Sequence, residues 1–134
     1  MNGETDLGRL LASMDPELAN EEYVFISSKS GVAMVDEHSL WAMIREAEGV
    51  TYILEKDSAR RSGYVSENVF RRITLRVHSS LEAVGFTAAI SAELSRHGLS
   101  ANFVSGFYHD HLFLPTHRAE EALEVLRTFS KQHQ

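Results

Sequence analysis

Apolar residues along the C-terminal half of the chain repeat first at every second position and then at helical spacing. Apolar and polar residues alternate over residues 72–77, which predicts a strand with one buried face. Apolar and β-branched residues predict two more strands, at Ala101–Ser105 and Asp110–Leu114, with a turn between them. After Pro115, apolar side chains at helical spacing with charges opposite predict an amphipathic surface helix. Its apolar positions are Ala119, Ala122, Leu123, Leu126 and Phe129.

A further helix is predicted directly after the first of these strands. Ser79, with Glu82 three residues later, has the pattern of a capping box, and the helix should then run to about His97 and end at Gly98. Gly85 falls in its first turns, where glycine is about 0.5–1 kcal/mol less favourable than alanine. Either close packing on the sheet or a first turn open to a small anionic group accounts for it, and both interpretations stay open.

The N-terminal half shows shorter segments of the same two kinds. Asp6 can cap a helix over Leu7–Met14, which ends at Asp15–Pro16 because a residue before proline avoids the helical region. The remaining predicted elements are a strand at Tyr23–Ser27, a short strand at Val32–Val35, a helix from Ser39 to Glu48 closed by Gly49, a strand at Val50–Leu54 and a helical turn at Asp57–Ser62.

The order of elements predicts an α+β fold. From residue 72 onwards it is β-α-β-β-α, whereas a ferredoxin-like βαββαβ unit has four strands. We therefore expect Tyr23–Ser27 or Val50–Leu54 to complete the second sheet, giving two interlocked ferredoxin-like halves with antiparallel sheets, residues 1–66 and residues 67–134. Two small sheets leave edge strands that proteins pair or cover, so a symmetric homodimer is expected.

Composition narrows the classes of function. The net charge is −6 and the 13 basic residues are scattered, which argues against a nucleic-acid partner, because phosphate neutralisation needs a basic surface. The sequence contains no cysteine, so disulfides and thiolate metal sites are excluded. Its apolar stretches are shorter than the roughly 18 residues that cross a bilayer, and its start is acidic and polar. We expect a cytoplasmic protein with no membrane partner.

Two groups of residues raise the question of enzymatic chemistry. His109 and His111 share one side of an extended strand while Asp110 points to the other, and two imidazoles make only half of a tetrahedral metal site. His78 beside Ser79 invites a nucleophile interpretation, but no nucleophile elbow is present and helix capping is a sufficient role for the serine. We expect no metal, no cofactor and no enzymatic activity; a metal-dependent hydrolase using His109 and His111 is the less favoured alternative.

Several motifs together resemble a family of small bacterial ACT-domain proteins. The resemblance covers nearly the whole chain. The chain is also similar to the paired ACT units of aspartokinases and of eukaryotic arginine-sensing proteins. The most specific blocks are His78–Gly85 and Tyr108–Phe113. The others are Tyr23–Phe25, Arg45–Thr51, Ile73–Leu75, Asn102–Val104 and Arg118–Leu123.

The resemblance implies a free-standing regulatory module that binds a small molecule, often an amino acid, where a first strand meets a first helix. Mapped here, that site is His78–Thr87 with the facing strand Ala101–Ser105. The helix that opens after Ser79 would offer backbone N–H groups and a favourable dipole to a carboxylate. A structural or interaction module without a ligand is the alternative. The candidate ligand-binding residues are His78, Ser79, Ser80, Gly85, Phe86, Thr87, Asn102 and Val104.

Overall fold

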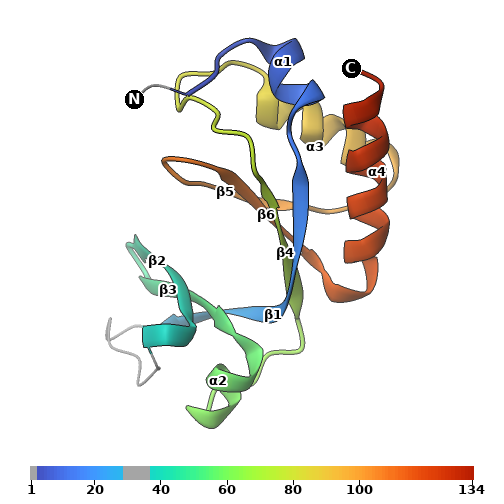
Figure 1. The fold of residues 1–134 in the computed structure, drawn as a ribbon. Helices are drawn as coiled ribbons and strands as arrows, with labels where there is room; N and C mark the ends of the chain where they lie inside the picture. Colours follow the sequence, from blue (N-terminus) through green and yellow to red (C-terminus); the bar gives the residue numbers. More distant parts are fainter. Residues whose placement is uncertain (1–2, 29–36) are drawn as a thin grey trace. The chain divides into compact units, whose positions relative to one another are not determined.

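The computed structural model describes residues 3–28 and 37–134 (Figure 1). The chain divides into two compact units: unit 1 comprises Met1–Asn20 and Arg71–Gln134, and unit 2 comprises Glu21–Phe70. The strand predicted at Val32–Val35 lies outside the described residues. The helices are α1 (Leu7–Ala12), α2 (Lys56–Arg61), α3 (Phe86–Arg96) and α4 (Ala119–Lys131). The strands are β1 (Pro16–Ser28), β2 (Leu40–Glu46), β3 (Gly49–Glu55), β4 (Phe70–Leu75), β5 (Asn102–Ser105) and β6 (Asp110–Pro115). Single 3-10 turns occupy Glu37–Ser39 and Thr116–Arg118.

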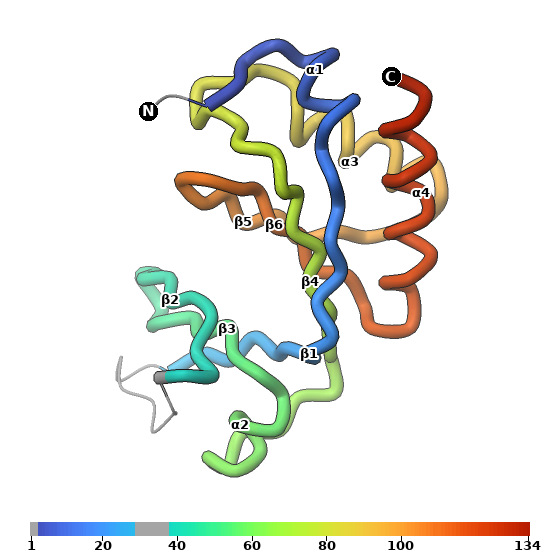
Figure 2. The backbone as a smooth tube through the Cα atoms, in the orientation of Figure 1, coloured from blue at the N-terminus to red at the C-terminus, as the bar shows by residue number. Residues whose placement is uncertain are grey.

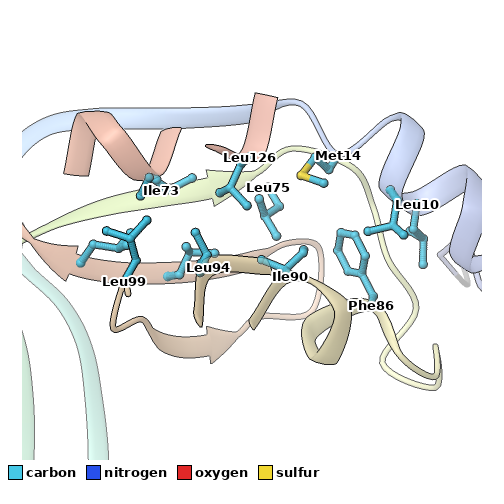
Figure 3. Close-up of a cluster of buried hydrophobic side chains, with 13 residues drawn as sticks. Leu10, Met14, Ile73, Leu75, Phe86, Ile90, Leu94, Leu99 and Leu126 are labelled. Atoms are coloured by element: carbon cyan, nitrogen blue, oxygen red, sulfur yellow. The ribbon is translucent and has the colours of Figure 1, made fainter. Parts of the chain in front are cut away.

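Unit 1 contains a sheet with the strand order β1-β4-β6-β5. The apolar core of the unit lies between this sheet and the helices. Strands β5 and β6 pair antiparallel. The core gathers apolar side chains from α1, β4, α3, β6 and α4 (Figure 3), so these helices bury one face of the sheet. Its fully buried members include Leu10, Ile73, Ile90, Leu112 and Leu126.

The strand that completes the sheet of unit 1 comes from the N-terminal half, as the sequence predicts, but not from the predicted residues Tyr23–Ser27 or Val50–Leu54, which belong to unit 2. It is β1, whose first residues, Pro16–Asn20, belong to unit 1 while its later residues belong to unit 2. The predicted strand, Tyr23–Ser27, is therefore only the second part of β1. Together with β4, α3, β5, β6 and α4, it gives unit 1 its ferredoxin-like arrangement.

Unit 2 has the strand order β2-β3-β1, and both strand pairs are antiparallel. Its core is a separate apolar cluster built on β1, β3 and α2. The helix predicted from Ser39 to Glu48 is wrong, because the segment forms β2 and its edge pairs with β3 up to Glu46 opposite Gly49. Alanine, methionine and glutamate in this segment suit a helix, but propensity is a weak force beside pairing with an adjacent strand. Gly49 opens β3 instead of closing a helix.

The helix predicted to open after Ser79 begins only at Phe86, so the predicted capping box is wrong. The hydroxyl of Ser79 donates to the buried Asp110 and caps nothing, while the backbone N–H of Glu82 donates to Ser80. Gly85 is the N-cap residue of α3, at φ +94°, a left-handed backbone conformation that a helix interior does not use. Residues 78–85 therefore form a loop between β4 and α3, which we call the ligand loop.

The other predicted elements are confirmed with small shifts of their ends. α1 is capped by Asp6, whose Oδ1 accepts from the backbone N–H of Arg9 at 2.9 Å. α3 ends before Gly98, which has φ +69° as expected for a residue that closes a helix. Among residues 3–28 and 37–134, no helix is long and apolar enough to cross a bilayer. The division into residues 1–66 and 67–134 stays a prediction.

Candidate functional site

A small pocket lies where the ligand loop meets the start of α3 and the adjoining ends of β5 and β6. Its volume is about 130 Å³. Apolar side chains and polar ones share its wall. The lining residues are Ser79, Ser80, Leu81, Ala83, Phe86, Thr87, Ser105 and Asp110. All belong to unit 1.

One wall of the pocket is the N-terminal end of α3. The first amides of a helix have no partner inside it, and here the N-cap residue, Gly85, has no side chain to accept from them. Phe86 and Thr87, the first two residues of α3, line the pocket. This end of the helix carries the positive part of its dipole, which favours a negatively charged group beside it.

The pocket also reaches a buried carboxylate. Asp110 is 7% exposed, and its Oδ2 accepts from the hydroxyl of Ser79, itself 6% exposed, at 2.8 Å. A carboxylate inside a protein needs hydrogen-bond donors or a cation to offset its lost hydration. The Ser79 hydroxyl supplies one donor, and the pocket gives a cationic group access to the same side chain.

The predicted ligand-binding residues are only partly brought together. Ser79, Ser80, Phe86 and Thr87 line the pocket, and Gly85 directly precedes Phe86. The other three lie elsewhere: Asn102, Val104 and His78 do not line it.

On β5 it is Ser105, directly opposite Asp110 in the strand pair, that lines the pocket. Asn102 is paired with Phe113, toward the other end of the strand pair. His78 instead lies against two exposed rings, with centroids 6.3 Å from Phe107 and 5.3 Å from Tyr108. A role in ligand contact for these residues stays a prediction.

Leu81, Ala83 and Ser105 fall within the predicted ranges His78–Thr87 and Ala101–Ser105 but were not among the named ligand-binding residues, and sequence reasoning missed Asp110. The sequence did contain a signal for the last of these. Because side chains alternate along a strand, Asp110 shares a face with Leu112 and Leu114, which are core residues. An acidic residue on the core face of a strand predicts a buried carboxylate with a specific partner.

The two histidines that flank Asp110 take part in hydrogen bonds with β4 and the residues after it. Nδ1 of His109 lies 3.2 Å from the carbonyl oxygen of Val77, to which it donates. Nδ1 of His111 lies 2.9 Å from Oγ1 of Thr74, which also accepts from Nε of Arg72.

Because a guanidinium only donates, the Thr74 hydroxyl is free to donate its own proton to His111, which is then neutral. Burial, with the positive charges of Arg72 and His109 nearby, lowers the pKa of His111 from 6.5 to about 4. Within the described part of the chain, no group of three or more His, Asp or Glu side chains is placed to hold a metal ion.

A wider groove of about 530 Å³ lies elsewhere in unit 1, between the ends of α1 and α4. It is bordered by Asp15, Arg127 and Lys131, which are exposed. Its buried hydroxyl, on Ser130, donates to the carbonyl oxygen of Ala12 at 3.1 Å. The smaller pocket is the better candidate, because its buried carboxylate and open helix end face the same space.

Models of known protein families match both the N-terminal and the C-terminal part of the chain. Two family models, each described as ACT domain, match it over residues 2–71 and residues 69–128. The chain belongs to the ACT domain family. ACT domains are typically regulatory modules that bind small ligands. The second match contains the ligand loop, all of α3 and the buried Asp110. No curated protein matches the sequence.

Solved structures of other proteins have the same fold. A Vibrio cholerae protein of unknown function, described as a possible transport protein, is 45% identical with a TM-score of 0.77, over 89% of this chain and 92% of that chain. An Agrobacterium tumefaciens protein is 15% identical with a TM-score of 0.66, over 86% and 87% of the two chains. The regulatory subunit of aspartate kinase from Thermus thermophilus is 10% identical with a TM-score of 0.60, over 84% and 95%. The last two likenesses concern the fold alone.

Proposed function

We propose that this ACT protein is a regulatory module that binds a small α-amino acid in the pocket at the start of α3. The observation that carries the proposal is the pairing of opposite polarities across one small space. An open helix end favours an anion, while the buried Asp110 favours a cation. A zwitterionic amino acid carries both charges on one carbon atom.

The geometry suggests how each end of the ligand is held. Its carboxylate accepts from the free backbone N–H groups in the first turn of α3, at Phe86 and Thr87. Its ammonium group donates to Asp110, whose other partner is the Ser79 hydroxyl. The hydroxyl of Ser105 can both donate and accept, so it suits either end.

The size of the pocket restricts the ligand. Pockets for drug-sized molecules measure about 300–1,000 Å³, whereas this one measures about 130 Å³. Amino acids with short side chains therefore fit better than aromatic or long basic ones. The rest of the wall next to the helix is apolar, since Leu81, Ala83 and Phe86 line it.

Thermal melts with each of the twenty amino acids at millimolar concentration test the proposal. A ligand at about 100 times its dissociation constant stabilises the folded protein by about 2.7 kcal/mol, which corresponds to a melting shift of about 8 °C at this length. The shift should vanish in Asp110→Asn and persist in Glu67→Gln, a control that removes an exposed acid of unit 2. If no amino acid moves the melt by more than about a degree, the alternative of a ligand-free interaction module takes its place.

We also infer that the protein acts as a homodimer and signals through a partner protein. Strands β2 and β5 stand at the two ends of the hydrogen-bonded strand order, so each has an edge that a second copy can cover. ACT domains are typically regulatory modules, which supports a protein that acts on another chain. The cytoplasmic location stays a prediction.

A further inference from the structure

The N-terminal residues 3–6, which we call the N-terminal strap, run alongside the ligand loop. The backbone N–H of Glu4 donates to the carbonyl oxygen of His78 at 2.8 Å, and the backbone N–H of Ser80 donates to the carbonyl oxygen of Glu4 at 2.9 Å. These two bonds form a parallel bridge centred on Ser79. Figure 2 shows the blue N-terminal segment beside the yellow-green loop. The backbone of Glu4 is therefore hydrogen-bonded to both neighbours of Ser79, the residue whose hydroxyl donates to Asp110.

The contact between strap and loop is close enough to require glycine. A Cβ atom on Gly3 would lie 2.6 Å from the carbonyl oxygen of His78 and 2.7 Å from the backbone nitrogen of Ser80. Both are backbone atoms, so no side-chain rotation relieves the clash. Any larger residue at this position pushes the strap and the ligand loop apart.

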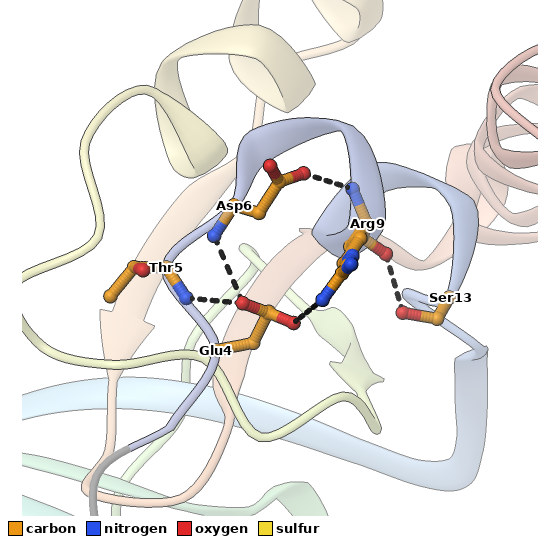
Figure 4. Close-up of polar contacts among 5 residues, drawn as sticks. All are labelled: Glu4, Thr5, Asp6, Arg9 and Ser13. Carbon is orange, nitrogen blue, oxygen red and sulfur yellow. Dashed lines mark hydrogen bonds and ion pairs between the residues drawn. The ribbon is translucent and has the colours of Figure 1, made fainter.

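The strap is itself anchored to the core through α1. The carboxylate of Glu4 turns back to accept from the backbone N–H groups of Thr5 at 2.9 Å and Asp6 at 3.1 Å, and Asp6 caps α1 (Figure 4). One turn further on, Leu10 is fully buried in the core of unit 1. A fixed helix thus presents the backbone of Glu4 to the loop.

The other hydrogen bonds of the loop do not position it. Ser79 N–H donates to Val77, Ala83 N–H donates to Ser80, and Glu82 N–H donates to the hydroxyl of Ser80. These bonds join close neighbours in sequence, so they shape the loop without fixing its place. Among the hydrogen bonds described for the loop, those with the strap and the one from Ser79 to Asp110 join it to residues distant in sequence, while Ala83 packs against the core and Gly85 accepts from Ala89 of α3.

We propose that the N-terminal strap is a positioning element of the ligand site, which holds Ser79 and Ser80 where the pocket requires them. The link to ligand affinity rests on the proposed function. By thermodynamic reciprocity, the factor by which the docked strap raises ligand affinity equals the factor by which the ligand stabilises the docked strap. Ligand occupancy is then reported at the N-terminal segment of the protein.

Amide hydrogen exchange of the ligand-free full chain tests the strap without any ligand. In Gly3→Val, amides of the ligand loop should exchange about tenfold faster or more, because the backbone hydrogen bonds between strap and loop are lost. Amides of β6 should keep their protection. The matched control is Gly8→Ala within α1, where the nearest atom to a new Cβ lies 3.4 Å away, and its loop exchange should be unchanged.

Glu4→Pro provides a second route, because proline lacks the N–H that donates to His78. Unchanged loop exchange in both variants overturns the proposal, as does a loss of protection throughout unit 1, which would make the strap part of the core.

The amino-acid panel is then repeated on Gly3→Val. Its ligand affinity should fall by about the same factor as that by which the population of the closed loop falls. Equal binding in Gly3→Val and the unmodified protein contradicts the coupling. If no amino acid binds the unmodified protein, the proposed function fails, while the exchange data still decide the role of the strap.

Discussion

Replacing Ser79 with alanine probes the polar contact on which the pocket depends. The hydroxyl and the carboxylate of Asp110 are both more than nine-tenths buried and lie 2.8 Å apart. A hydrogen bond to a charged group contributes about 1.5–3 kcal/mol. At about 3–4 °C per kcal/mol for this length, Ser79→Ala should lower the melting temperature by about 5–12 °C.

A double-mutant cycle separates this role from helix capping. A lost N-cap costs about 1 kcal/mol regardless of what occupies position 110. If the Ser79 hydroxyl instead stabilises Asp110, the cost of removing it depends on whether Asp110 is present. Urea unfolding of Ser79→Ala, Asp110→Ala and the double variant should then give an interaction free energy of about 1 kcal/mol or more. Ser80→Ala, which removes a half-buried neighbouring hydroxyl, should show no such coupling. Costs for Ser79 and Asp110 that add within about 0.5 kcal/mol would refute this account of the pocket.

Further predictions concern the backbone, the pH dependence, the core and the assembly. Gly85→Ala should destabilise the protein by about 1–2 kcal/mol, because residue 85 has φ +94°, whereas Gly8→Ala in a helix should be neutral or stabilising by urea unfolding. The lowered pKa of His111 means that the unfolded chain takes up the proton first, so stability should fall as pH drops from 6.5 to about 4, and urea unfolding of His111→Gln should show a smaller decline. Leu126→Ala should cost about 2–5 kcal/mol in the same assay, because Leu126 is fully buried. Light scattering should give twice the chain mass of 15.0 kDa, and a monomer at every concentration would contradict the dimer.

The elements that the sequence predicts well are those in which local pattern and tertiary environment agree. The apolar side chains that alternate over residues 72–77 and those of the stripe over residues 119–129 pack into the same core. Strand β4 and helix α4 therefore form largely where expected. The segment that became β2 is different, because its side chains suit a helix and its state is decided by pairing with β3. Pattern within one segment does not contain that information.

The start of β1 was missed for a related reason. Pro16–Glu22 contains three glutamates and an asparagine, a composition that predicts no strand, yet it forms the first part of β1. These residues are in a strand because neighbouring strands supply hydrogen-bond partners for their backbone. The side-chain composition of a segment predicts whether it is buried better than it predicts whether its backbone pairs with a neighbouring strand.

The predicted ligand site and the pocket share part of their residues, but the buried carboxylate of Asp110 was not predicted. Ser80, Phe86 and Thr87 line the pocket near the predicted helix start, although the helix opens at Phe86 and not after Ser79. The capping-box pattern is local, whereas the true partner of Ser79 is Asp110, 31 residues away. Serine hydroxyls serve either role, and only the folded chain shows which.

Nuclear magnetic resonance of the isotopically labelled protein, titrated with each of the twenty amino acids, tests the central claim most directly. We predict that a small amino acid shifts the backbone amide signals of Phe86, Thr87 and Ser105 saturably, because these residues line the pocket between the start of α3 and Asp110. Signals in the groove beside Arg127 and Lys131 should stay unchanged. Saturable shifts confined to that groove, or no shifts with any amino acid, would contradict the assignment of this pocket as the ligand site.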